Sequence, residues 1–189
     1  MKFREKVMGE LVGIVPRKLD VSTLLDVVRK YADIMMHTME RYFVLEDTME
    51  ITDKIAQDVM KNVMKYAKIL KKGPENYEAR AEIMWCGSLS HNGLTGCGTC
   101  GGDWATYLIE HELGGMFDVA HGAGLAAVWG SWARYVMDEK PERFAQFAVD
   151  VMGVEESDDV KSTALKGIEA VEEFYRMIEM PTNMKELGI

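Results

Sequence analysis

Hydrophobic residues recur at steps of three and four along most of the chain, the spacing that gathers them on one face of an α-helix. The first clear run consists of Leu24, Leu25, Val28, Ala32, Met35, Met36 and Met39. Asp20 or Ser22 stands where a side-chain oxygen can cap the first turn of such a helix. We expect the methionines of this run to lie in the core, because Met fills uneven gaps between packed helices.

A second helix is predicted to begin near Thr52 and to end at Lys71-Lys72-Gly73-Pro74. Cations suit the C-terminal end of a helix, and Gly followed by Pro stops it. Similar periodicity predicts further helices over 75–90, 104–113, 123–137, 141–152 and 156–178. The glycines between Asn92 and Gly102 indicate a loop, Asp103 is expected to cap the next helix, and Gly114-Gly115 is expected to break it.

No stretch alternates between apolar and polar residues over the length of a β-strand, and no repeat or low-complexity linker separates the helical segments. A chain of 189 residues is long enough for one domain with a full core. The sequence therefore predicts a single all-α domain of about seven helices.

Charge and cysteine content narrow the range of functions. A net charge of −9 argues against nucleic-acid binding, which needs clustered Lys and Arg. No apolar run approaches the roughly 20 residues that span a bilayer, and charges throughout Met1 to Glu10 argue against a signal peptide. The odd number of cysteines, three, then favours a reduced, cytoplasmic setting. Cys97 and Cys100 lack further soft ligands, which favours two loop thiols.

Four histidines offer the most informative chemistry. Asp33 and His37 are four residues apart on a predicted helix, so that their side chains share one face and can hold one ion together. His111 lies near the end of another predicted helix, and His121 follows ten residues later, past a turn. A carboxylate with imidazoles suits Fe(II) or Zn(II) and is poor for calcium. Taken alone this spacing is common on solvated helix faces, and a site-free interpretation is favoured.

Four longer segments change that balance. They read ADIMMHTMERYF over 32–43, SHNGLTG over 90–96, DWATYLIEHEL over 103–113 and DVAHGAGLA over 118–126. In sequence and in spacing they resemble segments of the iron-containing alcohol dehydrogenases, in a butanol-dehydrogenase-like branch. The segment 32–43 resembles the first metal motif of that family, and 90–96 resembles the glycine-containing segment that precedes the second. The resemblance covers about 32–189 and leaves 1–31 as an N-terminal segment without a clear match.

Members of that family have an N-terminal Rossmann-like domain for NAD(P) and a C-terminal helical domain that holds the metal. The resemblance implies that Asp33, His37 and His121 are metal ligands for Fe(II) or Zn(II). It places His111 near the metal and the nicotinamide, as a catalytic and cofactor-binding residue in a proton relay. The implied reaction is hydride transfer between NAD(P) and a small primary alcohol or aldehyde.

The chain departs from the family at one ligand. The family usually has a histidine four residues before the position of His111, and this chain has Tyr107. A neutral phenol is a poor ligand for Fe(II) or Zn(II), so the resemblance predicts three ligands and weaker metal binding. We expect His91 to order the glycine-rich loop through hydrogen bonds.

No glycine-rich turn after a strand marks a dinucleotide site, so we expect NAD(P) to bind only when a separate nucleotide-binding domain is supplied. The chain alone is then expected to be inactive, as a fragment, a split subunit or a degenerate relative. A homo-oligomer or a cofactor-domain partner would cover the exposed metal pocket. The alternative hypothesis is a non-catalytic helical metal-binding or interaction module.

Overall fold

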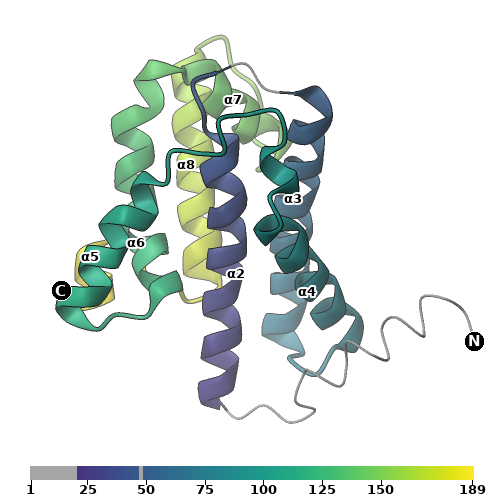
Figure 1. The fold of residues 1–189 in the computed structure, drawn as a ribbon, viewed down its shortest axis with the longest axis vertical. Helices are drawn as coiled ribbons and strands as arrows, with labels where there is room; N and C mark the ends of the chain where they lie inside the picture. The colour runs from purple at the N-terminus through teal and green to yellow at the C-terminus, as the bar shows by residue number, and fades with distance from the viewer. Residues whose placement is uncertain (1–20, 47–48) are drawn as a thin grey trace, which may run out of the picture.

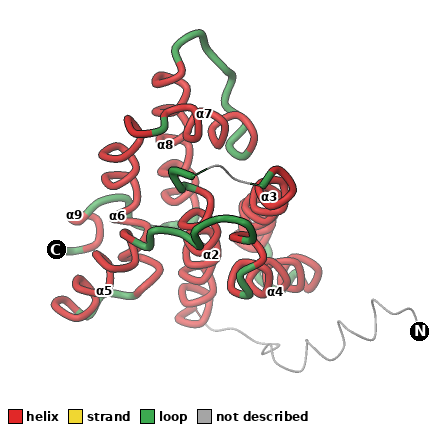
Figure 2. The backbone as a smooth tube through the Cα atoms, turned by 45° about the horizontal axis from the view of Figure 1, so that its top comes forward, coloured by secondary structure: helices red, strands yellow, loops and turns green. Residues whose placement is uncertain are grey.

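The computed structural model describes residues 21–46 and 49–189, with side chains from residue 30 onward. The helices are α2 (Val21–Tyr42), α3 (Glu50–Lys72), α4 (Tyr77–His91), α5 (Ala105–Phe117), α6 (His121–Val136), α7 (Pro141–Asp150), α8 (Val160–Met177) and α9 (Met184–Leu187). Two 3-10 turns, η1 (Leu94–Gly96) and η2 (Met137–Glu139), lie between them. No strand occurs within these ranges (Figure 2), and the predicted all-α architecture is confirmed.

The long helix α2 runs through the middle of the molecule (Figure 1). Helices α3 and α4 pack on one side of it and α6 on another, while α7 and α8 form a closely packed pair. The predicted methionine stripe is buried, with Met35, Met36 and Met39 at most 1% exposed. It meets a core whose largest fully buried side chains include Trp129, Tyr175, Phe147, Leu125 and Ile168.

The expected helix ends are mostly close to the observed ones. Helix α3 ends at Lys72 with Gly73 as its C-cap. The Asp103 carboxylate accepts a 2.8 Å hydrogen bond from the Ala105 amide at the start of α5. The proposed cap at Asp20 falls outside the described residues, as do residues 1–20 of the N-terminal segment.

One expected helix end is wrong. Helix α5 continues through Gly114-Gly115 to Phe117 and ends at Asp118, which has a left-handed backbone with φ 53°. Each glycine lowers helix stability by about 1 kcal/mol. The continuing backbone ladder outweighs that cost, since the Asp118 amide still donates to the Gly114 carbonyl at 3.0 Å. The extra turn leaves Asp118, Val119 and Ala120 to connect α5 with α6.

A buried ion pair fixes α7 against α3 and α2. The Arg143 guanidinium donates to both oxygens of Asp53, at 2.6 and 2.7 Å, and to the Tyr42 carbonyl at 2.9 Å. Its central carbon lies 3.6 Å from the centre of the Tyr42 ring, in cation–π contact. Both charged residues are less than 10% exposed, so each depends on the other to compensate its charge.

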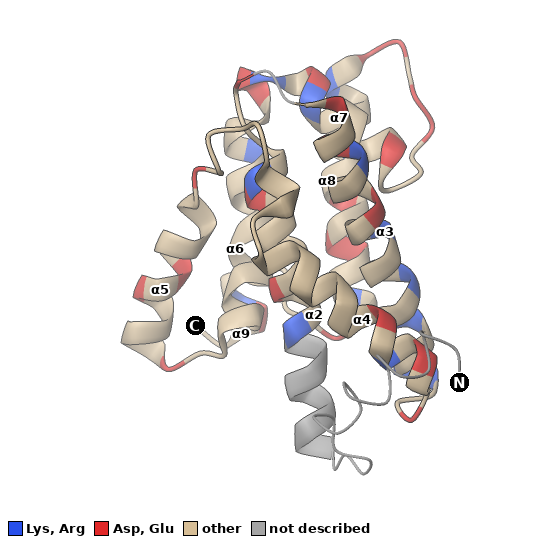
Figure 3. Ribbon diagram, turned by 45° about the vertical axis from the view of Figure 1, so that its right-hand side comes forward, with Lys and Arg blue, Asp and Glu red and all other residues tan. Residues whose placement is uncertain are grey.

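Charged side chains are unevenly distributed. Figure 3 shows Lys, Arg, Asp and Glu over α3, α7 and α8, whereas α5 and α6 carry few of them. Helix α5 exposes Leu108, Ile109, Met116 and Phe117, of which Met116 is 71% exposed. An apolar surface of this kind is typical of a face that meets another protein surface. None of the helices described here is long and apolar enough to cross a lipid bilayer.

Candidate metal centre

Four helices bring ionisable side chains to one place beside α2. Asp33 and His37 lie one turn apart in the middle of α2, His91 is the last residue of α4, and His121 is the first residue of α6. Tyr107 projects from the first turns of α5 toward the same place. The site therefore depends on where helices begin and end as well as on the face of α2.

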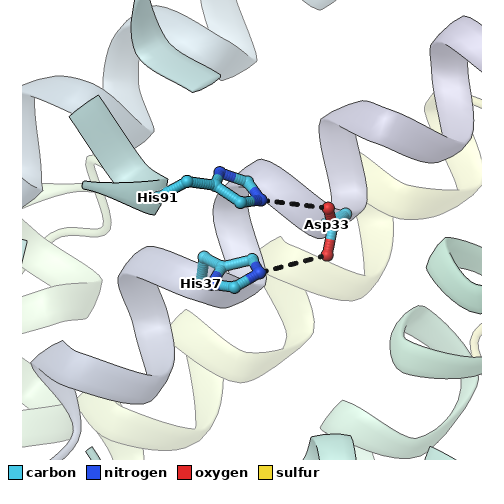
Figure 4. Close-up of side chains that lie close together, drawn as sticks. All are labelled: Asp33, His37 and His91. Atoms are coloured by element: carbon cyan, nitrogen blue, oxygen red, sulfur yellow. Dashed lines mark ion pairs between the residues drawn. The ribbon is translucent and has the colours of Figure 1, made fainter. Parts of the chain in front are cut away.

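The Asp33 carboxylate is the centre of the group. Its Oδ1 atom lies 3.7 Å from Nε2 of His37 and 3.5 Å from Nε2 of His121. Its Oδ2 atom lies 3.4 Å from Nε2 of His91. Figure 4 shows the His37 and His91 rings directed at the two carboxylate oxygens from α2 and from the end of α4. Three imidazoles thus present the same ring nitrogen to one carboxylate.

These spacings suit a small divalent cation. Ligand atoms that each lie about 2.0–2.1 Å from a tetrahedral ion are about 3.4 Å from one another. Asp33, His37 and His91 also offer one ligand atom each within 4.8 Å of one another. Carboxylate oxygen with imidazole nitrogen is a donor set for zinc or ferrous iron. The side chains present therefore fit such an ion.

Two of the imidazoles have their tautomers set by acceptors behind them. Nδ1 of His91 lies 2.9 Å from the Gly87 carbonyl and 2.7 Å from Oγ of Ser90. A carbonyl only accepts, so Nδ1 of His91 carries a proton, and the ring is oriented with Nε2 facing Asp33. Nδ1 of His121 likewise contacts the buried carboxylate of Glu110. This is the arrangement of outer partners that orients histidine ligands around metals.

His37 is kept neutral by its surroundings. Burial lowers its pKa to about 4, and the neighbouring His91 ring lowers it further than the Asp33 carboxylate can raise it. The His37 and His91 rings are 3.8 Å apart between centres, and the Trp104 ring lies edge-on to His37 at 5.2 Å. A neutral imidazole is the form of histidine that binds metals.

Tyr107 acts as a hydrogen-bond donor to Asp33. Its hydroxyl donates to Oδ1 of Asp33 at 2.9 Å, and its ring lies 5.0 Å from His37 and 5.3 Å from His121. Burial, and then the negative charge of Asp33, raise the pKa of Tyr107 far above its usual range. In this arrangement Tyr107 is therefore a neutral phenol that serves as a hydrogen-bond donor to Asp33.

A second buried acid, Glu40, links α2 to the start of α5 beside the site. Glu40 is 2% exposed, and it accepts a short hydrogen bond from the Thr106 hydroxyl on α5. Burial raises the pKa of Glu40 to about 7 despite that hydrogen bond. Gly102, with φ 100°, brings the loop so close that a Cβ there would lie 2.8 Å from the Glu40 carbonyl oxygen. The glycine thus allows the start of α5 to approach α2.

Comparison with known proteins identifies the fold and the segment. A sequence model of the Fe-containing alcohol dehydrogenase family, C-terminal, matches residues 28–189. The chain belongs to the iron-containing alcohol dehydrogenase family. It is 34% identical over 159 residues to NADH-dependent butanol dehydrogenase A of Clostridium acetobutylicum, covering 84% of this chain and 41% of that protein.

Two further proteins are similar to this chain over the same segment. The NADPH-dependent aldehyde reductase YqhD of Escherichia coli is 32% identical over 158 residues, which is 83% of this chain and 40% of that protein. The crystal structure of NADH-dependent butanol dehydrogenase A from Thermotoga maritima superposes with a TM-score of 0.81 at 36% identity, over 86% of this chain and 40% of that one. The chain thus spans about two fifths of the length of these relatives.

Within this family framework, the structure brings Asp33, His37 and His121 together, with Tyr107 on the wall between them. His111 is exposed on α5, and its ring stacks on His121 with 5.6 Å between centres. It forms a second group with Glu110 and His121, whose ligand atoms also lie within 4.8 Å of one another. The assignment of these residues as metal ligands and as a proton relay stays a prediction.

Two site residues were missed from the sequence. Glu110 was not singled out, although an acid next to His111 in the matched segment 103–113 could have indicated it. His91 was expected to order the glycine-rich loop, but its hydrogen bonds go to Gly87 and Ser90 of its own helix. Its other nitrogen is turned toward Asp33, which sequence spacing alone could not reveal because α4 and α2 meet only in the fold.

Proposed function

We propose that this chain forms the metal-binding part of an NAD(P)-dependent alcohol dehydrogenase or aldehyde reductase that acts on small primary alcohols and aldehydes. The observation that carries the proposal is the convergence of the Nε2 atoms of His37 and His121 on Asp33, at 3.7 and 3.5 Å. Its chemical support is the donor set, and its family support comes from relatives whose names specify butanol dehydrogenase and aldehyde reductase activity. Asp33, His37 and His121 would hold Fe(II) or Zn(II).

Each side chain has a role that its contacts allow. A divalent cation bound by these residues supplies Lewis-acid polarisation of an alcohol or carbonyl oxygen. Glu110 keeps His121 in the tautomer that turns Nε2 toward Asp33, and Tyr107 holds Asp33 through its hydroxyl. His111 is exposed and stacked on His121, so it can pass a proton between the site and solvent.

We propose that the dinucleotide phosphates of NAD(P) are held by residues outside those described here. The described ranges contain no strand and so no strand-turn-helix unit that could bind a dinucleotide phosphate. We propose that a nucleotide-binding domain, on a longer chain or as a separate subunit, faces the site beside α5. The exposed Leu108 and Ile109 on that helix are suited to such a contact.

Two measurements test this function. Elemental analysis of protein purified without chelators should find about one zinc or iron per chain. NADPH oxidation with butanal should be absent for these 189 residues alone and should appear when the nucleotide-binding domain of a butanol dehydrogenase relative is added. Asp33→Ala is the matched control, since it should abolish both metal content and the restored activity. Metal content without restored activity would contradict the dehydrogenase proposal.

Tyr107 favours a second candidate function, a metal-binding module without catalysis. Its hydroxyl donates to Oδ1 of Asp33 at 2.9 Å. The family resemblance predicts a histidine ligand at this position instead of a tyrosine. A chain of this kind would bind the ion but would not turn over butanal with any nucleotide-binding domain. The activity measurement separates the two functions directly.

A further inference from the structure

We propose that His91, at the end of α4, is a metal ligand that takes the place of the histidine missing at position 107. This inference rests on the proposed metal site at Asp33, His37 and His121, and it adds to that site a ligand from a helix that the family resemblance does not implicate. The result is a four-ligand centre made of one carboxylate and three imidazoles. Tyr107 then serves only as the donor that orients Asp33.

The geometry of His91 matches that of the other two imidazoles. Its Nε2 atom lies 3.4 Å from Asp33, the shortest of the three imidazole-to-carboxylate distances and nearest to the edge of a tetrahedral zinc site, about 3.4 Å. Its ring is packed against His37 with 3.8 Å between centres, so both rings approach the carboxylate from neighbouring directions (Figure 4). An ion at the carboxylate is therefore within reach of both.

The hydrogen bonds behind His91 prepare it for this role. Its Nδ1 proton goes to the Gly87 carbonyl, and the Ser90 hydroxyl that contacts the same nitrogen donates to that carbonyl at 3.0 Å. The ring is thus held by its own helix with Nε2 turned outward, toward Asp33. In metal-binding histidines the N–H of the second ring nitrogen characteristically donates a hydrogen bond to a carbonyl or carboxylate in this way.

The arrangement of three imidazoles around one carboxylate suits a single ion. The Nε2 atoms of His91, His121 and His37 lie 3.4, 3.5 and 3.7 Å from the oxygens of Asp33. A divalent ion beside Asp33 is attracted by the carboxylate and can take a lone pair from each of the three imidazoles.

The test is zinc affinity, measured by competition with a chromophoric chelator on the parent chain and on variants of matched chemistry. His91→Ala should weaken binding by more than about 100-fold, beyond the 10- to 100-fold that loss of an outer partner causes. In the His91→Ala background, Tyr107→His should raise the zinc affinity again by at least about tenfold, because it supplies an imidazole to the site from α5. His111→Ala tests the alternative group at Glu110 and His121, and it should weaken zinc binding less than His91→Ala does.

Each other outcome is decisive. If His91→Ala binds zinc like the parent while Asp33→Ala does not, the proposal for His91 fails and the proposed metal site stands. If the parent binds no zinc, both fail. If His111→Ala loses zinc affinity and His91→Ala does not, the ion binds at Glu110. If Tyr107→His does not restore the affinity of His91→Ala, His91 does not replace a ligand at position 107. Either result overturns the proposal.

A measurement on the unmodified protein guards against variants that do not fold. Long-range proton–nitrogen NMR spectra of the labelled parent should resolve its four imidazoles. Zinc should shift Nε2 of His37, His91 and His121 while Nδ1 of His91 stays protonated. An Nε2 signal of His91 that does not respond to zinc, in a sample where that of His37 does, overturns the proposal without any substitution.

Discussion

Replacing Glu40 with Gln should make the fold more stable at neutral pH. Burial raises the pKa of Glu40 from 4.5 to about 7, so the folded chain keeps a proton that the unfolded chain releases above pH 4.5. The free energy of unfolding therefore falls by 1.36 kcal/mol per pH unit between these two values, about 3 kcal/mol in all. Glu40→Gln keeps the size and the acceptor for the Thr106 hydroxyl but cannot ionise.

The assay is urea unfolding followed by far-UV circular dichroism from pH 4.5 to pH 8. Relative to the parent, the unfolding free energy of Glu40→Gln should rise by about 3 kcal/mol across this range and level off above pH 7. The difference between the two proteins is the useful quantity, because His37, with its pKa lowered to about 4, contributes stability that is lost as pH falls from 6.5. Glu112→Gln on exposed α5 controls for the change in net charge. A difference that stays constant with pH would refute the reasoning.

Three further changes have defined outcomes. Tyr107→His should tighten zinc binding by about tenfold, because an imidazole beside Asp33 is a far better zinc ligand than a neutral phenol. Chelator competition that finds no gain in affinity contradicts this prediction. Arg143→Ala should lower the unfolding free energy by about 3–5 kcal/mol, because it removes the guanidinium from beside the buried Asp53 carboxylate. A urea midpoint equal to that of the parent would contradict this prediction. Gly124→Ala places a Cβ 2.7 Å from Cγ of Glu110 and should weaken zinc binding by about tenfold. Gly115→Ala, with open space at its Cβ, should not, and equal effects of the two would count against the role of Glu110.

The fold was readable from the sequence because its helices are amphipathic and bounded by local residues. Met35, Met36 and Met39 recur at helical spacing and lie in the core, and Gly73 ends α3 where the Gly-Pro pair predicts. The misplaced end of α5 has a physical origin. Glycine opposes a helix by about 1 kcal/mol, which tertiary context overrides, so Gly114-Gly115 could not by itself fix the boundary.

The site was only partly readable. Asp33 and His37 share a helix face, so their pairing follows from spacing, and the segment around His121 was found by resemblance. The orientation of His91 depends on which ring nitrogen faces the Gly87 carbonyl. That hydrogen bond lies within α4, but the placement of the other ring nitrogen beside Asp33 depends on the packing of α4 against α2, which no local pattern encodes. The neutral state of Tyr107 is likewise a product of burial beside Asp33, and only three-dimensional structure reveals it.

The dispersal of the site over α2, α4 and α6 has a consequence for the order of folding. Asp33 and His121 lie almost half the chain apart, and closing a loop of that length costs an unfolded chain about 4 kcal/mol. In the folded domain the core has already closed that loop. An ion at the proposed site would therefore meet its ligands after the helices have packed, unlike the ion of a zinc finger, which organises a short local segment. Such an ion would raise the free energy of unfolding in proportion to the logarithm of its free concentration, because it would bind only the native state.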